Sequence, residues 1–228
     1  MCAEGVGYEF SRPELLEQAL THSSYSSEHG LGRHASNERL EYLGDAVLKA
    51  VVAEALMRMM PDASEGAMSK VSAQVLSGRT LARVARRLRL GDMLRLSHGE
   101  ELSGGRNKRR NLAGAMEAVI GAVFIDGGFD AARGFIMRWM EREIAQAISE
   151  PLADYKTALQ ERVQAGGAGT VSYTTLSVEG PPHAPVFTVQ AVINGRPASI
   201  GVGSSRRDAE QNAARAALES LESLESLE

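Results

Sequence analysis

The sequence has few of the features that mark secreted or membrane proteins. It contains one cysteine, Cys2, in 228 residues, which excludes an intramolecular disulfide, and no cysteines and histidines are spaced like a zinc site. The first residues lack the basic segment and apolar run of a secretory signal. The longest apolar stretch, 112–125, contains Glu117 and is shorter than the roughly 20 residues that span a bilayer. We therefore expect a cytoplasmic protein with no membrane partner.

An excess of positive charge is also lacking. The chain has 25 basic and 29 acidic residues, a net charge of −4, which taken alone argues against a polyanionic partner. The charge is unevenly distributed, because residues 79–110 contain ten basic residues and three acidic ones. This segment could neutralise phosphates, or it could be a helix face whose charges pair with carboxylates. Charge alone leaves both interpretations open.

The apolar pattern predicts an all-α N-terminal domain over residues 1–148, in which no segment alternates like a strand. Ser64 is expected to begin a helix, and a polar loop is expected over 97–107. Helices are predicted directly after Pro13 and over 37–60, 68–88, 111–125 and 129–148, with ends at Pro61, Gly91 and Gly127–Gly128.

A second, smaller α+β domain is predicted over residues 152–221, after a short linker that contains Pro151. Its segments are rich in β-branched residues, which favours strands between two helices in the order α-β-β-β-α. Residues 222–228 form a low-complexity tail. The predicted elements are a helix over 155–164, strands over 171–178, 186–193 and 198–202, and a helix over 205–221.

Carboxylates gather on one face of the predicted helix 37–60. Glu38, Glu41 and Asp45 fall within an arc of about 60° at 100° per residue. Such a cluster is typical of a Mg²⁺ site, but the same spacing also occurs on an ordinary solvated face. Glu117 interrupts an apolar helix and indicates either a ligand of the same site or a buried ion pair. Glu65 is a weaker candidate, since an acidic residue also favours a helix N-terminus.

A polar segment begins the last predicted helix. Ser204, Ser205, Arg206 and Arg207 combine hydroxyls, free backbone N–H groups and guanidinium groups at the positive end of a helix. This combination suits a phosphate backbone, although two serines before a helix are also an ordinary cap.

Several motifs together resemble the ribonuclease III family. Residues 37–48 (NERLEYLGDAVL) match the family signature almost residue for residue. Residues 65–69, 99–106 and 112–126 resemble further family motifs. Residues 152–221 resemble a double-stranded RNA-binding domain. The resemblance extends from about residue 5 to 222.

The resemblance implies a homodimeric endoribonuclease that hydrolyses double-stranded RNA with Mg²⁺, for which Mn²⁺ can substitute. The products would carry 5′-phosphate and 3′-hydroxyl ends, and the role would be in rRNA and mRNA processing. By the family pattern, Asp45 and Glu117 are catalytic, and Glu41, Asp45 and Glu117 hold the metal. The remaining assignments are Glu38 and Glu65 as accessory acidic residues and Tyr42 in the dimer contact.

For the second domain the resemblance implies contacts with RNA from three segments: a first helix, the loop between strands one and two, and the start of the last helix. Recognition would depend on the A-form shape of the duplex. The residues are Thr157, Gln160, Glu161 and Gln164, then His183, and then Ser204, Ser205, Arg206 and Arg207.

One position departs from the family. The family has an aspartate three residues before the central glutamate, whereas this chain has Gly114. A metal ligand is therefore missing. Two hypotheses stay open: an active endoribonuclease, and a protein that binds double-stranded RNA with impaired or no cleavage.

Overall fold

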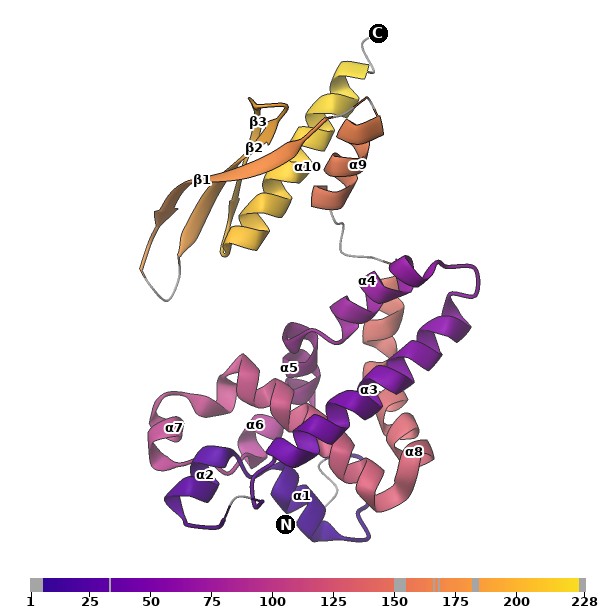
Figure 1. Cartoon of the computed structure of the whole chain (residues 1–228). Coiled ribbons are helices and arrows are strands. Elements are labelled where there is room, and N and C mark those ends of the chain that lie inside the picture. The colour runs from indigo at the N-terminus through magenta and orange to yellow at the C-terminus, as the bar shows by residue number, and fades with distance from the viewer. Residues whose placement is uncertain are drawn as a thin grey trace. The chain divides into compact units, whose positions relative to one another are not determined.

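The computed structural model describes residues 6–32, 34–149, 155–165, 167, 169–181 and 185–225. The chain divides into two compact units, Met1–Leu152 and Ala153–Glu228. Figure 1 shows helices in the first unit and a sheet with two helices in the second. The elements of the first unit are α1 (Pro13–Ala19), α2 (Ser23–Glu28), α3 (Glu38–Met59), α4 (Glu65–Val75), α5 (Gly78–Arg87), α6 (Leu90–Met93), α7 (His98–Leu102), the 3₁₀ turn η2 (Gly105–Asn107) and α8 (Arg109–Ser149).

The core of the first unit lies between α3 and α8, which pack side by side (Figure 1). Helix α3 buries Leu48 and Val51, and α8 buries Met116 and Ile120, all fully. Helix α5 packs against α8 as well. These apolar positions recur at helical spacing, so burial of one face of each helix produces this packing.

Helix α8 consists of two helical stretches joined at a bend. Gly128 has φ 77° and ψ −170°, a backbone conformation that residues with a β-carbon rarely adopt. The predicted helix end at Gly127–Gly128 is therefore confirmed. By length and composition alone α8 could cross a membrane, but 61% of its most apolar window is buried within the unit.

Three sequence predictions in the first unit are wrong in detail. The predicted helix 68–88 is two helices, because the Ser77 hydroxyl accepts a hydrogen bond from the Thr80 N–H and begins α5. Gly91 lies inside the short helix α6 and does not end a helix. The predicted loop 97–107 contains α7, capped by the Ser97 hydroxyl, and η2.

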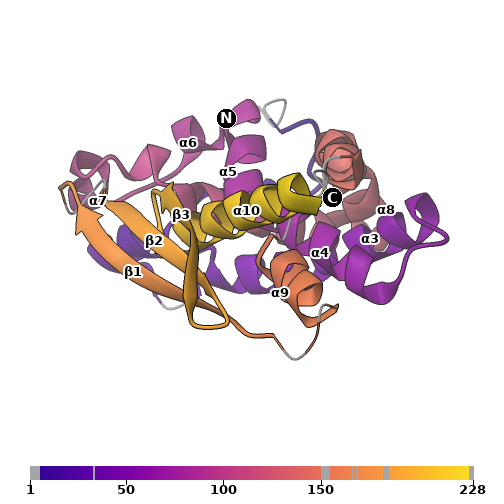
Figure 2. The same ribbon diagram turned by 90° about the horizontal axis from the view of Figure 1, so that it is seen from above.

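The second unit is an antiparallel sheet in the order β1-β2-β3, with both helices on one face (Figure 2). Asn194 (φ 51°) and Gly195 (φ 76°) join β2 to β3, as the two positive φ angles of a type I′ turn require. Leu159 and Ala214 are buried between the helices and the sheet. The elements are α9 (Tyr155–Ala165), β1 (Val171–Glu179), β2 (Val186–Ile193), β3 (Arg196–Gly203) and α10 (Arg206–Glu225).

The predicted α-β-β-β-α order is confirmed. Helix α10 continues to Glu225, so most of the segment expected as a low-complexity tail is helical.

Candidate active site

The candidate site is built where α3 and α8 cross. At Gly44 an added β-carbon would overlap the carbonyl oxygen of Glu117, and at Gly121 it would overlap that of Leu40. The two backbones therefore touch at this point. The close approach places Glu41, one turn before Gly44, and Asp45, the residue directly after it, next to Glu117 of α8. A local sequence feature, glycine on each helix, thus determines which carboxylates meet.

Four of the five carboxylates predicted from the sequence line one cavity of about 710 Å³. Glu38, Glu41 and Asp45 reach it from α3, and Glu117 reaches it from α8. Glu65 is not among the lining residues; it is exposed at the start of α4, where it accepts a hydrogen bond from the Ser69 hydroxyl. The other lining residues are His22, Ser23, Asn37, Tyr42, Glu100, Lys108, Arg110, Asn111 and Gly114.

Burial and mutual repulsion disfavour negative charge in this cavity. Burial, followed by the charges of Glu41 and Asp45, raises the pKa of Glu117 to about 7. The pKa of Glu41 is also raised, first by burial, against an opposing effect of the Arg110 guanidinium. Within the described residues Glu117 forms no ion pair, so a buried ion pair, the alternative interpretation of this residue, is not found there. Perturbed carboxylates of this kind mark functional sites more often than structural ones.

Asp45 already has a cationic neighbour. The ammonium of Lys49, one turn further along α3, donates to Asp45 Oδ2 at 2.6 Å. This hydrogen bond raises the pKa of Lys49.

Gly114 leaves a space that another carboxylate fills. A β-carbon at position 114 would lie 2.7 Å from Glu41 Oε2, so the Glu41 carboxylate rests directly against the helix at this glycine. An aspartate there would push the Glu41 side chain aside, which is inexpensive because only the flexible end must move.

The residues present fit a hard divalent cation by their chemistry. Five carboxylates line one cavity, and burial followed by mutual repulsion raises the pKa values of Glu41 and Glu117 in spite of the nearby cations Arg110 and Lys49. As the side chains stand, no three histidine, cysteine, aspartate or glutamate residues of the described ranges converge on a single metal position. A cation there would be coordinated by a few carboxylates, with water completing its shell, as is usual for Mg²⁺.

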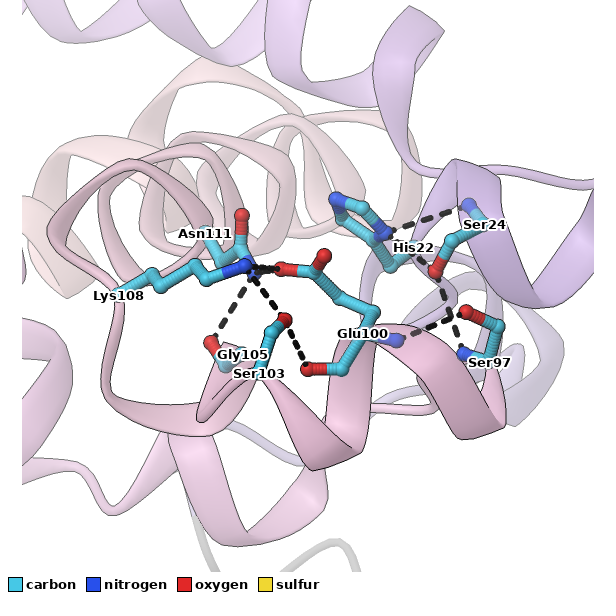
Figure 3. Close-up of polar contacts among 8 residues, drawn as sticks. All are labelled: His22, Ser24, Ser97, Glu100, Ser103, Gly105, Lys108 and Asn111. Atoms are coloured by element: carbon cyan, nitrogen blue, oxygen red, sulfur yellow. Dashed lines mark hydrogen bonds and ion pairs between the residues drawn. The ribbon is translucent and has the colours of Figure 1, made fainter.

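A hydrogen-bond network borders the cavity (Figure 3). The Glu100 carboxylate accepts from Lys108 Nζ and Asn111 Nδ2, each at 2.8 Å, and these contacts lower its pKa. His22 lies opposite, with Nδ1 within 2.8 Å of the Ser24 hydroxyl, and burial lowers its pKa. None of these residues was predicted from the sequence as part of the site. The motif at 99–106 was the one available signal, because it includes Glu100.

Tyr42 is at the edge of the same cavity. Its side chain is 82% exposed, a large aromatic surface without a partner in the described part of this chain. Such a surface is compatible with the predicted dimer contact.

The second unit has a cavity of about 610 Å³ between its helices. Thr157 lines it from α9, while Arg206 and Arg207 line it from the start of α10. The Ser205 hydroxyl accepts a hydrogen bond from the Asp208 N–H, and the Ser204 hydroxyl donates to the Asp208 carboxylate. Ser205 is thus the helix cap, Ser204 supports it through the Asp208 side chain, and the structure also brings the two arginines to one surface.

The other RNA-contact predictions are only partly placed. Gln160, Glu161 and Gln164 lie on α9 outside the residues that line this cavity. His183 lies outside the described residues.

Most of the basic segment 79–110 is engaged within the chain. Six of its ten basic side chains form ion pairs; Arg83 and Arg87, for example, both contact the buried Glu143. Of the other four, Arg86 donates a hydrogen bond to the Asn107 carbonyl, and within the described residues Arg79, Arg109 and Arg110 have no ion pair. The interpretation of the segment as a paired helix face is therefore correct for most of it, and Arg110 points its charge at the acidic cavity.

A helical unit with an acidic cavity, followed by a small unit with a basic helix start, is the architecture of a nuclease that carries its own RNA-binding unit. Two family descriptions match the chain: "Ribonuclease-III-like" over residues 12–144, and "Double-stranded RNA binding motif" over 155–221. The chain belongs to the ribonuclease III family, whose members are endoribonucleases of double-stranded RNA. The resemblance seen in residues 37–48 is therefore confirmed.

Individual relatives are similar over nearly the whole chain. Ribonuclease 3 of Geobacillus kaustophilus is 42% identical over 214 residues, which cover 94% of this chain and 87% of that protein. Ribonuclease 3 of Clostridium acetobutylicum is 43% identical, with 94% and 93% covered. The solved nuclease domain of ribonuclease III from Campylobacter jejuni is 39% identical, with a TM-score of 0.57, and covers 61% of this chain and 93% of that one.

Proposed function

We propose that the first unit hydrolyses phosphodiester bonds of double-stranded RNA with Mg²⁺, leaving 5′-phosphate and 3′-hydroxyl ends. One observation carries the proposal: Glu41, Asp45 and Glu117 come together in one cavity, where the pKa of Glu117 is raised to about 7. Buried carboxylates that repel one another favour binding of a divalent cation, because the cation removes the repulsion.

In this proposal each acidic residue has a role. Glu41, Asp45 and Glu117 hold the ion, and Glu38 supports the acidic edge of the cavity. A bound Mg²⁺ would lower the pKa of an attacking water and stabilise the leaving 3′ oxygen. Arg110, on the cavity wall, attracts the RNA phosphates into a site that would otherwise repel them. Glu65 would act in the same cavity only if a second subunit supplied it.

The second unit would bind the duplex by shape. Thr157, Arg206 and Arg207 line one surface, where the arginines would contact phosphates and Thr157 the minor groove. Gln160, Glu161 and Gln164 on the same helix, His183, and the Ser204–Ser205 turn would complete this contact. The family pattern supports a homodimer through Tyr42, a cytoplasmic location, and substrates among precursor rRNA and mRNA.

Cleavage of an end-labelled RNA duplex across a titration of Mg²⁺ or Mn²⁺ tests the proposal. We expect cleavage to appear with the metal, and to vanish in Glu117→Gln while duplex binding persists. The proposal is wrong if ample metal gives no cleavage at protein concentrations that bind the duplex.

A second candidate function, binding of double-stranded RNA with little or no cleavage, is favoured by Gly114. The position lacks a carboxylate, and Glu41 occupies the space in front of it. Gly114→Asp separates the two candidates. A rise in cleavage rate of roughly tenfold or more would show that the missing ligand limits this chain, while Gly114→Asn, of equal size and without the charge, serves as the control. An unchanged rate in Gly114→Asp would show that position 114 is not limiting.

A further inference from the structure

Lys49 is a cation at the edge of the acidic cavity that none of the proposed steps uses. Its ammonium lies 2.6 Å from Asp45 Oδ2, four residues earlier on the same face of α3. The side chains of Lys49 and Asp45 are 58% and 40% exposed, and Asp45 lines the cavity while Lys49 contacts Asp45 from outside the lining. Its charge also acts on Glu117 across the helix crossing.

Asp45 has two competing partners, the Lys49 ammonium and the proposed metal ion. Asp45 is a proposed ligand of the divalent ion, yet its Oδ2 accepts a hydrogen bond from an ammonium. A metal bound through Oδ2 would compete with Lys49 for that oxygen, and a metal at either oxygen of Asp45 would be repelled by the lysine charge. The Arg110 guanidinium opposes the raised pKa of Glu41 in the same way. The cluster is thus partly neutralised from two sides by the chain itself.

We propose that Lys49 is an intrinsic counter-cation of this site, which holds Asp45 in the metal-free protein and must release it before Asp45 can serve as a ligand. Lys49 is therefore a positioning residue, because it changes the affinity for the ion through its contact with Asp45. The inference rests on the proposed metal-dependent function and deepens it.

The geometry makes the release easy. The lysine side chain is long, flexible and more than half exposed, so its ammonium can turn into water. Exposed ion pairs contribute little free energy, because water screens both charges and the long side chains lose entropy when they are held together. A divalent ion can therefore displace Lys49, and the lysine lowers the affinity without abolishing it. The missing carboxylate at Gly114 acts in the same direction.

Direct binding of Mn²⁺ to the metal-free full-length protein tests the inference, by calorimetry or by the electron paramagnetic resonance of the free ion. We expect Lys49→Gln to bind Mn²⁺ roughly three- to tenfold more tightly than the unsubstituted protein. Lys49→Arg should keep the weaker affinity. Lys70→Gln, which removes an exposed lysine of α4 outside the cavity, should change nothing.

A second readout is the melting temperature. In chelator, Lys49→Gln should melt at a lower temperature than the unsubstituted protein, because the carboxylates lose a counter-charge. In Mn²⁺ its rise in melting temperature should be larger. Equal or weaker Mn²⁺ affinity in Lys49→Gln would overturn the role of Lys49. A flat titration in all variants would overturn the metal centre itself, and this inference with it.

Discussion

Glu117 is a residue whose environment determines when it is charged. Its pKa is raised to about 7, first by burial and then by Glu41 and Asp45, whereas in the unfolded chain it titrates near 4.5. The folded state therefore binds the proton more tightly than the unfolded state. The resulting stability is fully present below pH 4.5 and is lost as pH rises through about 7.

We therefore expect the metal-free protein to lose stability from about pH 5 to about pH 8, on the order of 1–2 kcal/mol, since the carboxylate is partly solvated. Glu117→Gln should flatten this dependence, and added Mg²⁺ should do the same. Unfolding in chelator at the two pH values measures it. Glu14→Gln, at an exposed position of α1, should leave the slope unchanged. Equal slopes for all three proteins would show that Glu117 titrates normally.

At the residue scale the sequence predicted much of the site. Helical spacing placed Glu38, Glu41 and Asp45 together, and Glu117 was found because a carboxylate is costly in an apolar helix. Lys49 was within reach of the same reasoning, since it follows Asp45 by one turn. His22, Glu100 and Asn111 come from separate segments, and only the folded chain brings them to one cavity.

Among the elements, the crossing of α3 and α8 matters most, because it determines which carboxylates meet. A β-carbon at Gly44 would collide with the backbone of Glu117, and a backbone cannot turn away as a side chain can. We expect Gly44→Ala to destabilise the protein by about 2–3 kcal/mol and to abolish cleavage, because the helices must separate. Urea unfolding and the duplex cleavage assay measure both effects.

Gly134 offers a matched control on α8. It is exposed, and a β-carbon there would have no neighbour within 4 Å. Gly134→Ala should therefore stabilise the helix by up to about 1 kcal/mol and leave cleavage intact. If the two alanine variants behave alike, helix propensity and not the crossing controls the effect.

The elements themselves were predictable where the apolar pattern is long. The positions of α3, α9, β2 and the break in α8 follow from periodicity, Pro61 and Gly128. The prediction failed for short helices whose first turn depends on a single capping side chain. Helix α2 has the sequence SSYSSE, which has little helical propensity, and it forms where the His22 side chain accepts a hydrogen bond from the Ser24 N–H.

For the whole molecule, the net charge of −4 is the sum of acidic and basic regions of opposite sign. The acidic cavity lies in the first unit, while the basic segment 79–110 is mostly paired within that unit and contributes little free positive charge. The candidate RNA phosphate contacts of the second unit therefore depend on few side chains. Arg206 shares the Glu210 carboxylate with Lys156, whereas Arg207 has no ion pair in the described part of the chain.

This difference predicts an unequal contribution of the two arginines to RNA affinity. Arg207→Ala should weaken duplex binding roughly three- to tenfold and reduce the slope of log affinity against log salt by about one, the loss of one phosphate contact. Arg206→Ala should have a smaller effect, because the nearby Glu210 carboxylate already offsets part of its charge. Arg215→Ala, which removes an arginine paired with Glu219 further along α10, is the control.

Filter binding at several salt concentrations gives the affinities and slopes, and cleavage at saturating protein separates binding from catalysis. The rate at saturation should be equal in all three variants, because the acidic cavity belongs to the other unit. A lowered rate at saturation in Arg207→Ala would show that the second unit does more than bind. An unchanged salt slope would show that Arg207 does not contact a phosphate, and that the duplex lies on another surface of the unit.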